Sequence, residues 1–334
     1  MDTLSLILDD MRLQGGVFVH VDLTAPWALG LHTPGLASFH IMTSGSAWLL
    51  RDGAEPLYVQ QGDLVILPSG SAHTLVDKPG SSAAPHDLLP ELTNRPDAPL
   101  RVGGGGARST VVSGHARFDV MMASPLVAAL PPVMHIRAQG DQPPLWLAIG
   151  LQFLAQEVSD AKPAQQTVIN RLGDIMFIEC LRDYVESLPE SSGNWLVALR
   201  DKALSVTLGH MHRDPAHNWT VQELAQLACL SRSAFAERFT QTVGQPPLAY
   251  LTQHRMRLAA RQLSTSSLPV NRIASLVGYA SEAAFSQAFK REYGCSPSAY
   301  RELPALARAT PEPPAPDEAG SPDDLPDAQN VYPA

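Results

Sequence analysis

A segment that occurs twice in the last third of the chain constrains the fold more than any other feature. Residues 221–250 align with residues 270–300, and after one inserted residue the matching positions lie fifty apart. The matches are Phe235 and Phe285, Phe239 and Phe289, Gly244 and Gly294, Pro247 and Pro297, Ala249 and Ala299, and Tyr250 and Tyr300. Because chance similarity does not keep such a register, the segments are predicted to be two copies of one small folding unit.

Each copy has the spacing of two short helices. In the first copy, apolar residues three and four positions apart mark one helical face at Val221, Leu224, Ala225 and Ala228, and another at Phe235 and Phe239. Thr220, Ser231 and Ser281 are the expected N-caps, and Gly244 and Gly294 are the expected C-caps. Two helices joined by a turn of a few residues predict a helix-turn-helix unit, although a single copy fits a generic helical hairpin equally well.

Residues 247–264, between the copies, predict one long amphipathic helix with Arg255, Arg257 and Arg261 on its outward face. About 18 residues span roughly 27 Å, a length comparable to the ~34 Å between successive turns of a DNA major groove. A rigid helix of this length would present both units to one face of a duplex.

The segment that contains the repeat also differs in charge from the rest of the chain. Residues 195–303 carry 12 basic and 7 acidic groups, a net charge of +5, whereas the whole chain has a formal charge of −9. A basic segment in an acidic protein fits a polyanion partner, and it also fits a solvated helical surface. Residues 304–334 contain eight prolines and six acidic groups, and are predicted to be a disordered tail.

The segments SRSAFAERF (231–239), RMRLAARQL (255–263) and GYASEAAFSQAFKREYGCSPSAYR (278–301) resemble the AraC family of bacterial transcriptional regulators. The resemblance covers about residues 195–303 and implies two helix-turn-helix units that bind double-stranded DNA. One departure is Cys229, where glycine or another small residue is common.

The second helix of each unit is the one expected in the major groove. Candidates for base contacts are Arg232, Ser233, Ala236 and Glu237 in the first copy, and Glu282, Ala283, Ser286 and Gln287 in the second. Gln287 has the amide that pairs with adenine through two hydrogen bonds. Candidates for phosphate contacts are Arg238, Lys290 and Arg291.

The first 120 residues read as a β-barrel. Short strand-like runs alternate with Gly, Pro, Asp and Ser turn signals over residues 17–120, whereas residues 78–106 read as a long surface loop. The pattern G-x5-P-x-G-x2-H-x3-D, from Gly62 to Asp77 with its histidine at His73, resembles the second cupin motif. Phe39-His40-Ile41-Met42 corresponds to the first motif, with Met42 in place of a histidine and no glutamate after it.

The cupin resemblance implies a barrel that binds a small effector. Side chains expected to line its cavity are Phe18, Phe39, Trp48, Leu50, Ile66 and His73, which favours an apolar or weakly polar ligand. Of the candidates for effector binding, Phe39, His40, Trp48 and His73, the two histidines are also candidate ligands for a divalent metal. A metal site needs three or four ligands, so His20 or His32 would have to join them. No cofactor is expected, and two hydrogen-bonded barrel histidines are the simpler interpretation.

Residues 144–158 and 167–188 predict two amphipathic helices, which either pack on the barrel or form a dimer interface through Ile175 and Met176. No apolar run reaches the ~18 residues of a membrane span, so the expectation is a cytoplasmic protein.

The sequence thus predicts an α+β two-domain fold: a cupin-like effector barrel (1–135), a helical connector (136–194), an all-α double helix-turn-helix domain (195–303) and a disordered tail (304–334). The predicted function is sequence-specific regulation of transcription without catalysis, with activation or repression left open. Expected partners are double-stranded DNA, a small-molecule effector, a second copy of the chain and, for an activator, RNA polymerase, but no membrane. The alternatives are a metal-dependent cupin enzyme with a vestigial DNA-binding domain, and an architectural nucleic-acid binder.

Overall fold

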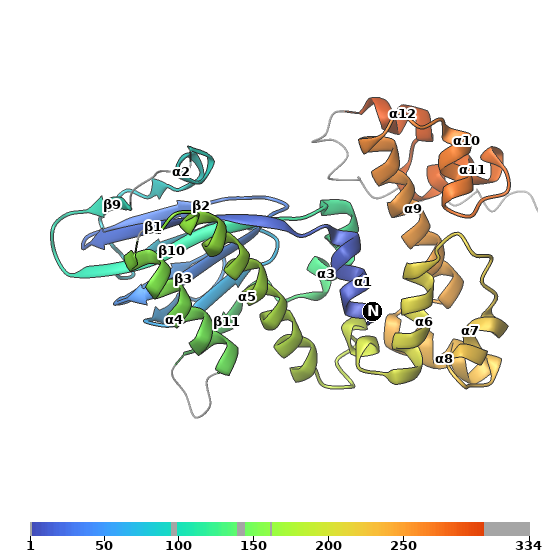
Figure 1. Cartoon of the computed structure of the whole chain (residues 1–334), viewed down its shortest axis with the longest axis horizontal. Coiled ribbons are helices and arrows are strands. Elements are labelled where there is room, and N and C mark those ends of the chain that lie inside the picture. Colours follow the sequence, from blue (N-terminus) through green and yellow to red (C-terminus); the bar gives the residue numbers. More distant parts are fainter. Residues whose placement is uncertain (1, 95–98, 139–143, 161, 304–334) are drawn as a thin grey trace, which may run out of the picture.

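A computed structural model describes residues 2–94, 99–138, 144–160 and 162–303, so the predicted tail lies outside the described residues. A β-rich N-terminal part is followed by two connecting helices and an all-helical C-terminal part (Figure 1). Among the described residues, no helix is both long and apolar enough to cross a membrane.

The N-terminal strands form two sheets. The six-stranded sheet has the order β11 (Met134–Ile136), β6 (Leu64–Leu67), β3 (Ala37–Ser44), β10 (Arg108–Arg117), β1 (Gln14–Thr24) and β9 (Leu100–Gly103). The five-stranded sheet has the order β5 (Leu57–Gln60), β4 (Ser46–Leu50), β7 (His73–Val76), β2 (Ala28–Leu31) and β8 (His86–Asp87). One apolar core, which includes Val19, Leu49 and Leu75, is built from both sheets.

Strand alternation gives the six-stranded sheet a second, outward apolar face. Phe39 lies on this face and makes an edge contact with Phe177 of α5 (Gln165–Ser187), with ring centroids 5.8 Å apart. Phe18 and Ile66 belong to the same outer cluster. Phe18, Phe39 and Ile66 were predicted to line the barrel cavity, and this prediction is wrong. Both faces of this sheet are apolar, because one faces the inner core and the other is covered by helices.

The predicted surface loop at residues 78–106 is wrong in part, because among the described residues only 78–85 and 104–106 form loops at its two ends. It contains β8, α2 (Leu89–Asn94) and β9, and its residues 95–98 lie outside the described part. β9 pairs in parallel with Val21–Thr24 of β1, and Leu88 and Leu92 are buried in the inner core. Short pairings between distant segments leave little periodic signal in the sequence.

Three further helices and one helical turn surround the sheets. They are α1 (Thr3–Met11), α3 (Val120–Ala129), α4 (Leu145–Asp160) and the 3₁₀ turn η1 (Trp195–Leu199). Helix α4 packs beside α5, where Met176 fills the space against Gly150. Met176 is buried and Ile175 is exposed, so of the two residues predicted at a dimer interface only Ile175 is at the surface.

The C-terminal part consists of α6 (Lys202–Arg213), α7 (Val221–Leu227), α8 (Arg232–Val243), α9 (Pro247–Thr265), α10 (Val270–Leu276), α11 (Glu282–Tyr293) and α12 (Pro297–Glu302). The helix-turn-helix units α7–α8 and α10–α11 lie toward opposite ends of α9 (Figure 1). Phe235 and Phe239 pack with Tyr250 in one core, whereas Phe285 and Phe289 pack with the second half of α9 in another.

The predicted helix ends are confirmed. The side chains of Thr220, Ser231 and Ser281 each accept a backbone N–H of the helix that follows. Gly244 and Gly294 end α8 and α11 in the left-handed conformation, with φ of 82° and 74°. In the turn of the second unit, Gly278 has φ 83°. Cys229, which occupies the corresponding position in the first unit, has φ 54°.

The Gly278→Ala substitution is expected to cost at least about 1 kcal/mol more stability than Gly244→Ala. Both glycines have positive φ, which costs an alanine roughly 1–2 kcal/mol. A Cβ at Gly278 would also lie 2.6 Å from the carbonyl oxygen of Ala216, whereas a Cβ at Gly244 meets nothing within 4 Å. Urea unfolding of both variants measures the difference, and equal losses would contradict the close packing of this turn.

Candidate DNA interface and effector cleft

Helices α8 and α11 present the predicted DNA-contacting residues at the surface. Exposed are Arg232, Ser233, Glu237 and Arg238 on α8, and Glu282, Ala283, Gln287, Lys290 and Arg291 on α11. Ala236 and Ser286 are half-buried beside the Phe pairs. The two helices thus offer matched exposed surfaces, each beginning at a serine N-cap.

Arg238 has a partner within the protein. Its Nε and Nη2 donate to Oδ2 of Asp201 at 2.8 and 2.6 Å. The other oxygen of Asp201 caps α6 by accepting from the backbone N–H groups of Ala203 and Leu204. A phosphate contact by Arg238, as the sequence predicts, would compete with this pairing.

The arginines of α9 do not point freely outward, so this prediction is wrong. Arg255 donates to the carbonyl oxygens of Pro215 and His217 at 2.6 and 2.8 Å, and Arg261 donates to the carbonyl oxygen of Asp10. Arg257 lines a small cavity beside α1. The loop before α7 and helix α1 cover this face of α9, which the helical periodicity alone does not reveal.

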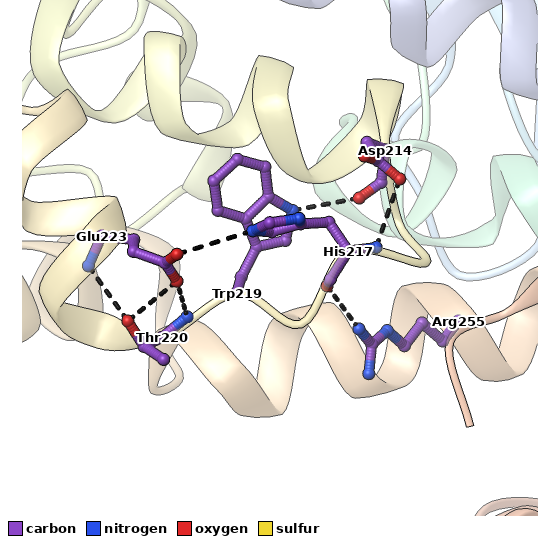
Figure 2. A network of polar contacts seen from close by, with 6 residues as sticks. All are labelled: Asp214, His217, Trp219, Thr220, Glu223 and Arg255. Carbon is purple, nitrogen blue, oxygen red and sulfur yellow. Dashed lines mark hydrogen bonds and ion pairs between the residues drawn. The ribbon is translucent and has the colours of Figure 1, made fainter. Parts of the chain in front are cut away.

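The loop held by Arg255 leads directly into the first helix-turn-helix unit (Figure 2). Trp219 donates its indole N–H to the carbonyl oxygen of Asp214, and Thr220 and Glu223 form a reciprocal capping box. The hydrogen bonds from Thr220 lower the pKa of the Glu223 carboxyl. Arg255 therefore ties α9 to the start of α7.

A buried polar chain crosses the inside of the β-rich part. His40 Nε2 lies 2.6 Å from His73 Nε2, His40 Nδ1 lies 2.8 Å from Ser113 Oγ, and His73 Nδ1 lies 2.7 Å from the carbonyl oxygen of Ser71. Burial is the main reason that the pKa of both histidines is lowered, so both are neutral. The carbonyl can only accept, which fixes the order: Ser113 donates to His40, His40 to His73, and His73 to Ser71.

The two histidines as arranged do not fit a metal ion. A metal site needs three or four ligands, and this pair supplies two, whose Nε2 atoms are hydrogen-bonded to each other. Neither His20 nor His32 completes a cluster, because the one group of three clustered ligands among the described residues lies elsewhere. The hydrogen-bonded pair that the sequence offered as the simpler alternative is the arrangement found.

A cleft of about 560 Å³ opens beside this chain. His73 lines it together with His32, Arg51, Asp52 and Asp87, and with Leu31 and Leu50 among the apolar residues. The positive charge of Arg51 and the neighbouring His32 add to burial in lowering the pKa of His73. A ligand in this cleft would reach the end of the polar chain.

Phe39 and Trp48, two of the residues predicted to bind an effector, face away from the inner core. Phe39 contacts Phe177 on the helix side, as described above. Trp48 lies between Ala47 and Leu49, which are both in the inner core, and its ring contacts that of Tyr58. Their predicted inward position is wrong, because the residues next to them on β3 and β4 are the ones whose side chains point into the inner core.

His115 is an inner polar residue that the sequence analysis missed. It lies two positions from Ser113 on β10 and is 3% exposed, and within the described part of the chain neither ring nitrogen has a hydrogen-bond partner. Burial lowers its pKa to about 4. Its alternation with Val111 and Ser113 along a predicted strand was the available signal.

Comparisons with known proteins agree with this architecture. A family model described as Cupin matches residues 2–186, and one described as Helix-turn-helix domain matches residues 224–303. The HTH-type transcriptional regulator AlkR of Acinetobacter baylyi is 38% identical over 313 residues, which cover 90% of this chain and 99% of that protein. An AraC-like transcription regulator of Streptomyces antibioticus is 35% identical over 305 residues, covering 91% and 99%.

Among solved structures, the DNA-binding domain of AdpA in complex with a target DNA is 34% identical. The match covers 33% of this chain and 95% of the AdpA domain, with a TM-score of 0.29.

The fold and the sequence relatives define a DNA-binding transcriptional regulator with an N-terminal cupin domain. The chain belongs to the AraC-like family of HTH-type regulators.

Replacing Gln287 by alanine is expected to relax sequence preference at one or two base pairs, by about 1–3 kcal/mol of discrimination. Gln287 is exposed on α11, and the substitution removes the amide that would read the base. Binding selection from a random DNA pool measures the preference. In the control variant Lys290→Ala, affinity should fall for all sequences alike, and an unchanged preference in Gln287→Ala would contradict its role.

Proposed function

We propose that the protein regulates transcription by binding DNA through α8 and α11 in response to a small effector bound in the cleft beside His73. The observation that carries the proposal is the continuity between this cleft and the buried chain from His73 through His40 to Ser113. A ligand that packs against His73 or displaces its hydrogen bond to the Ser71 carbonyl would act on both sheets, because His73 belongs to β7 and His40 to β3. The proposal keeps the predicted domain borders: the effector domain ends at residue 135, the connector at residue 194 and the DNA-binding domain at residue 303.

The lining of the cleft favours a ligand with polar groups, because it carries the Arg51 guanidinium as well as the carboxylates of Asp52 and Asp87. Arg51 and His32 supply cationic or donor groups, while Leu31, Leu50 and Pro85 supply apolar surface. A small organic acid with an apolar portion fits this combination better than a wholly apolar ligand.

A screen of small organic acids and their neutral amides by thermal unfolding tests the ligand class. A bound acid at about 100 times its dissociation constant stabilises by ~2.7 kcal/mol, which raises the melting temperature by about 5 °C. Arg51→Gln should lose this shift. The control Arg101→Gln, in a separate cleft of about 450 Å³, should keep it. Equal shifts in both variants would contradict the assignment of the cleft.

DNA binding itself is tested by selection followed by affinity measurements at increasing salt. A sequence preference together with a steep loss of affinity with salt supports specific regulation. Sequence-independent binding would favour an architectural role instead. Transcription in vitro with RNA polymerase on the selected sequence then distinguishes activation from repression.

We also propose that α4 is a contact surface for a second copy of the chain. Leu145, Ile149 and Phe153 recur every four residues and are 74%, 58% and 48% exposed. Residues 145–156 contain no charged side chain. A two-fold contact brings the same surface of both copies together, so a neutral apolar stripe suits it whereas a charged one would repel itself.

Phe153→Glu is expected to shift the protein from dimer to monomer, because it places like charges at the two-fold contact. Gln152→Glu, an exposed neighbour on the same helix, is the charge-matched control and should remain dimeric. Sedimentation velocity measures both. A wild-type protein that is monomeric at tens of micromolar, or a dimer that survives Phe153→Glu, would contradict this surface.

A further inference from the structure

Three potential metal ligands from distant parts of the chain meet where the N-terminal helix packs on the DNA-binding half. They are Asp10 of α1, His212 of α6 and His254 of α9, and one ligand atom from each lies within 4.8 Å of the others. Asp10 Oδ2 lies 2.8 Å from His212 Nδ1 and 3.8 Å from His254 Nε2. Figure 1 shows α1 lying against α6 at this point.

His254 carries an unused ligand atom directed into this cluster. Its side chain is 1% exposed, and Nε2 has no hydrogen-bond partner among the residues that the structure describes. An unpaired polar atom at such a buried position destabilises the fold unless something binds it. Burial and the neighbouring His212, Arg255, Arg257 and Arg261 lower the pKa of His254, so its imidazole is neutral and able to ligate a metal.

His212 is oriented as a metal ligand needs to be. Its Nε2 lies 2.8 Å from the hydroxyl oxygen of Tyr250, and its Nδ1 faces Asp10. Metal-binding histidines usually fix their second ring nitrogen in a hydrogen bond of this kind. Because the Asp10 carboxylate can only accept, Nδ1 carries the proton of that hydrogen bond in this structure; a metal would displace this proton, and Nε2 would then donate to Tyr250.

The space between these groups matches one small occupant. A cavity of about 20 Å³ is lined by all three residues, together with Tyr250 and Arg257. This volume is sufficient for one water molecule, and hence for one small ion. The Arg257 guanidinium disfavours an ion held by charge alone, so a metal with strong bonds to imidazole is selected over Ca²⁺ or Mg²⁺.

We propose that Asp10, His212 and His254 form a site for one divalent transition-metal ion of the zinc class. The site joins the first helix of the cupin part to both α6 and α9 of the DNA-binding half. Two imidazoles and one carboxylate are a common protein ligand set for zinc. Binding would hold the two halves in the arrangement described here, independently of an effector in the cleft.

The test is Zn²⁺ binding to untagged, chelator-treated full-length protein, measured by competition with a zinc dye and by thermal unfolding. The wild type should bind one ion per chain with a dissociation constant on the order of 1 µM or tighter and should melt at a higher temperature with zinc. His254→Leu should weaken binding at least roughly 100-fold, since the loss of outer partners alone costs roughly 10–100-fold.

Two controls separate this site from other histidines. His217→Leu removes an exposed histidine of the same half, and the double variant His40→Gln/His73→Gln removes the barrel pair. Both should keep zinc binding. Loss of binding in the barrel variant, or unchanged binding in His254→Leu, would overturn the proposal.

A measurement on the wild type alone covers the case in which His254→Leu does not fold. Co²⁺ in a site with nitrogen and oxygen ligands gives visible absorption bands whose intensity reports a tetrahedral geometry. Such bands, displaced by one equivalent of Zn²⁺ and absent in the near-isosteric Asp10→Asn, support the proposal. No visible bands at stoichiometric Co²⁺, together with no zinc binding, would refute it.

Discussion

The burial of helix α9 is the interaction on which the DNA-binding half depends. Tyr250 and Leu251 near its start complete the core around Phe235 and Phe239, and Met256 to Leu263 complete the core around Phe285 and Phe289. One rigid helix therefore sets the spacing between the two recognition helices. Helix α3 of the cupin part packs on α9, and α1 packs on α6. A change where α3 meets α9 would act on both helix-turn-helix units, because both are held by α9.

The cupin part is built so that its inner and outer faces share the same strands. His40 points into the polar chain, and the preceding Phe39 packs outward against Phe177 of α5. At the end of α5, the Arg200 guanidinium donates to the carbonyl oxygens of Val185, Glu186 and Leu188. Strand β3 therefore contacts α5, α5 contacts η1, and η1 contacts α6. A ligand that displaces β3 can act on the DNA-binding half through these successive contacts.

The sequence was sufficient for features that depend on local chemistry. The repeat, the capping serines and the closing glycines predicted the double helix-turn-helix, because caps and helical periodicity act within a few residues. The facing of Phe39 could not be predicted, since a sheet covered on both faces has no polar side to set its phase. Trp48 was misplaced because burial alternates along β4 but the run Trp48-Leu49-Leu50 is apolar throughout, which hides this alternation in the sequence. The cluster of Asp10, His212 and His254 was hidden for another reason: its members lie up to 244 positions apart and meet only through helix docking.

The use made of the basic residues bears on how this protein distinguishes one DNA sequence from another. The positive charge of residues 195–303 suggested a broad surface for phosphates, yet Arg200, Arg238, Arg255 and Arg261 each hold a contact within the protein. At the proposed DNA interface a smaller set of exposed cations is then available for phosphates, among them Arg232, Lys290 and Arg291. With fewer phosphate contacts, the sequence-independent part of the affinity is smaller. A larger share of the binding free energy must come from base contacts made by both recognition helices at once, which requires the fixed spacing that α9 provides.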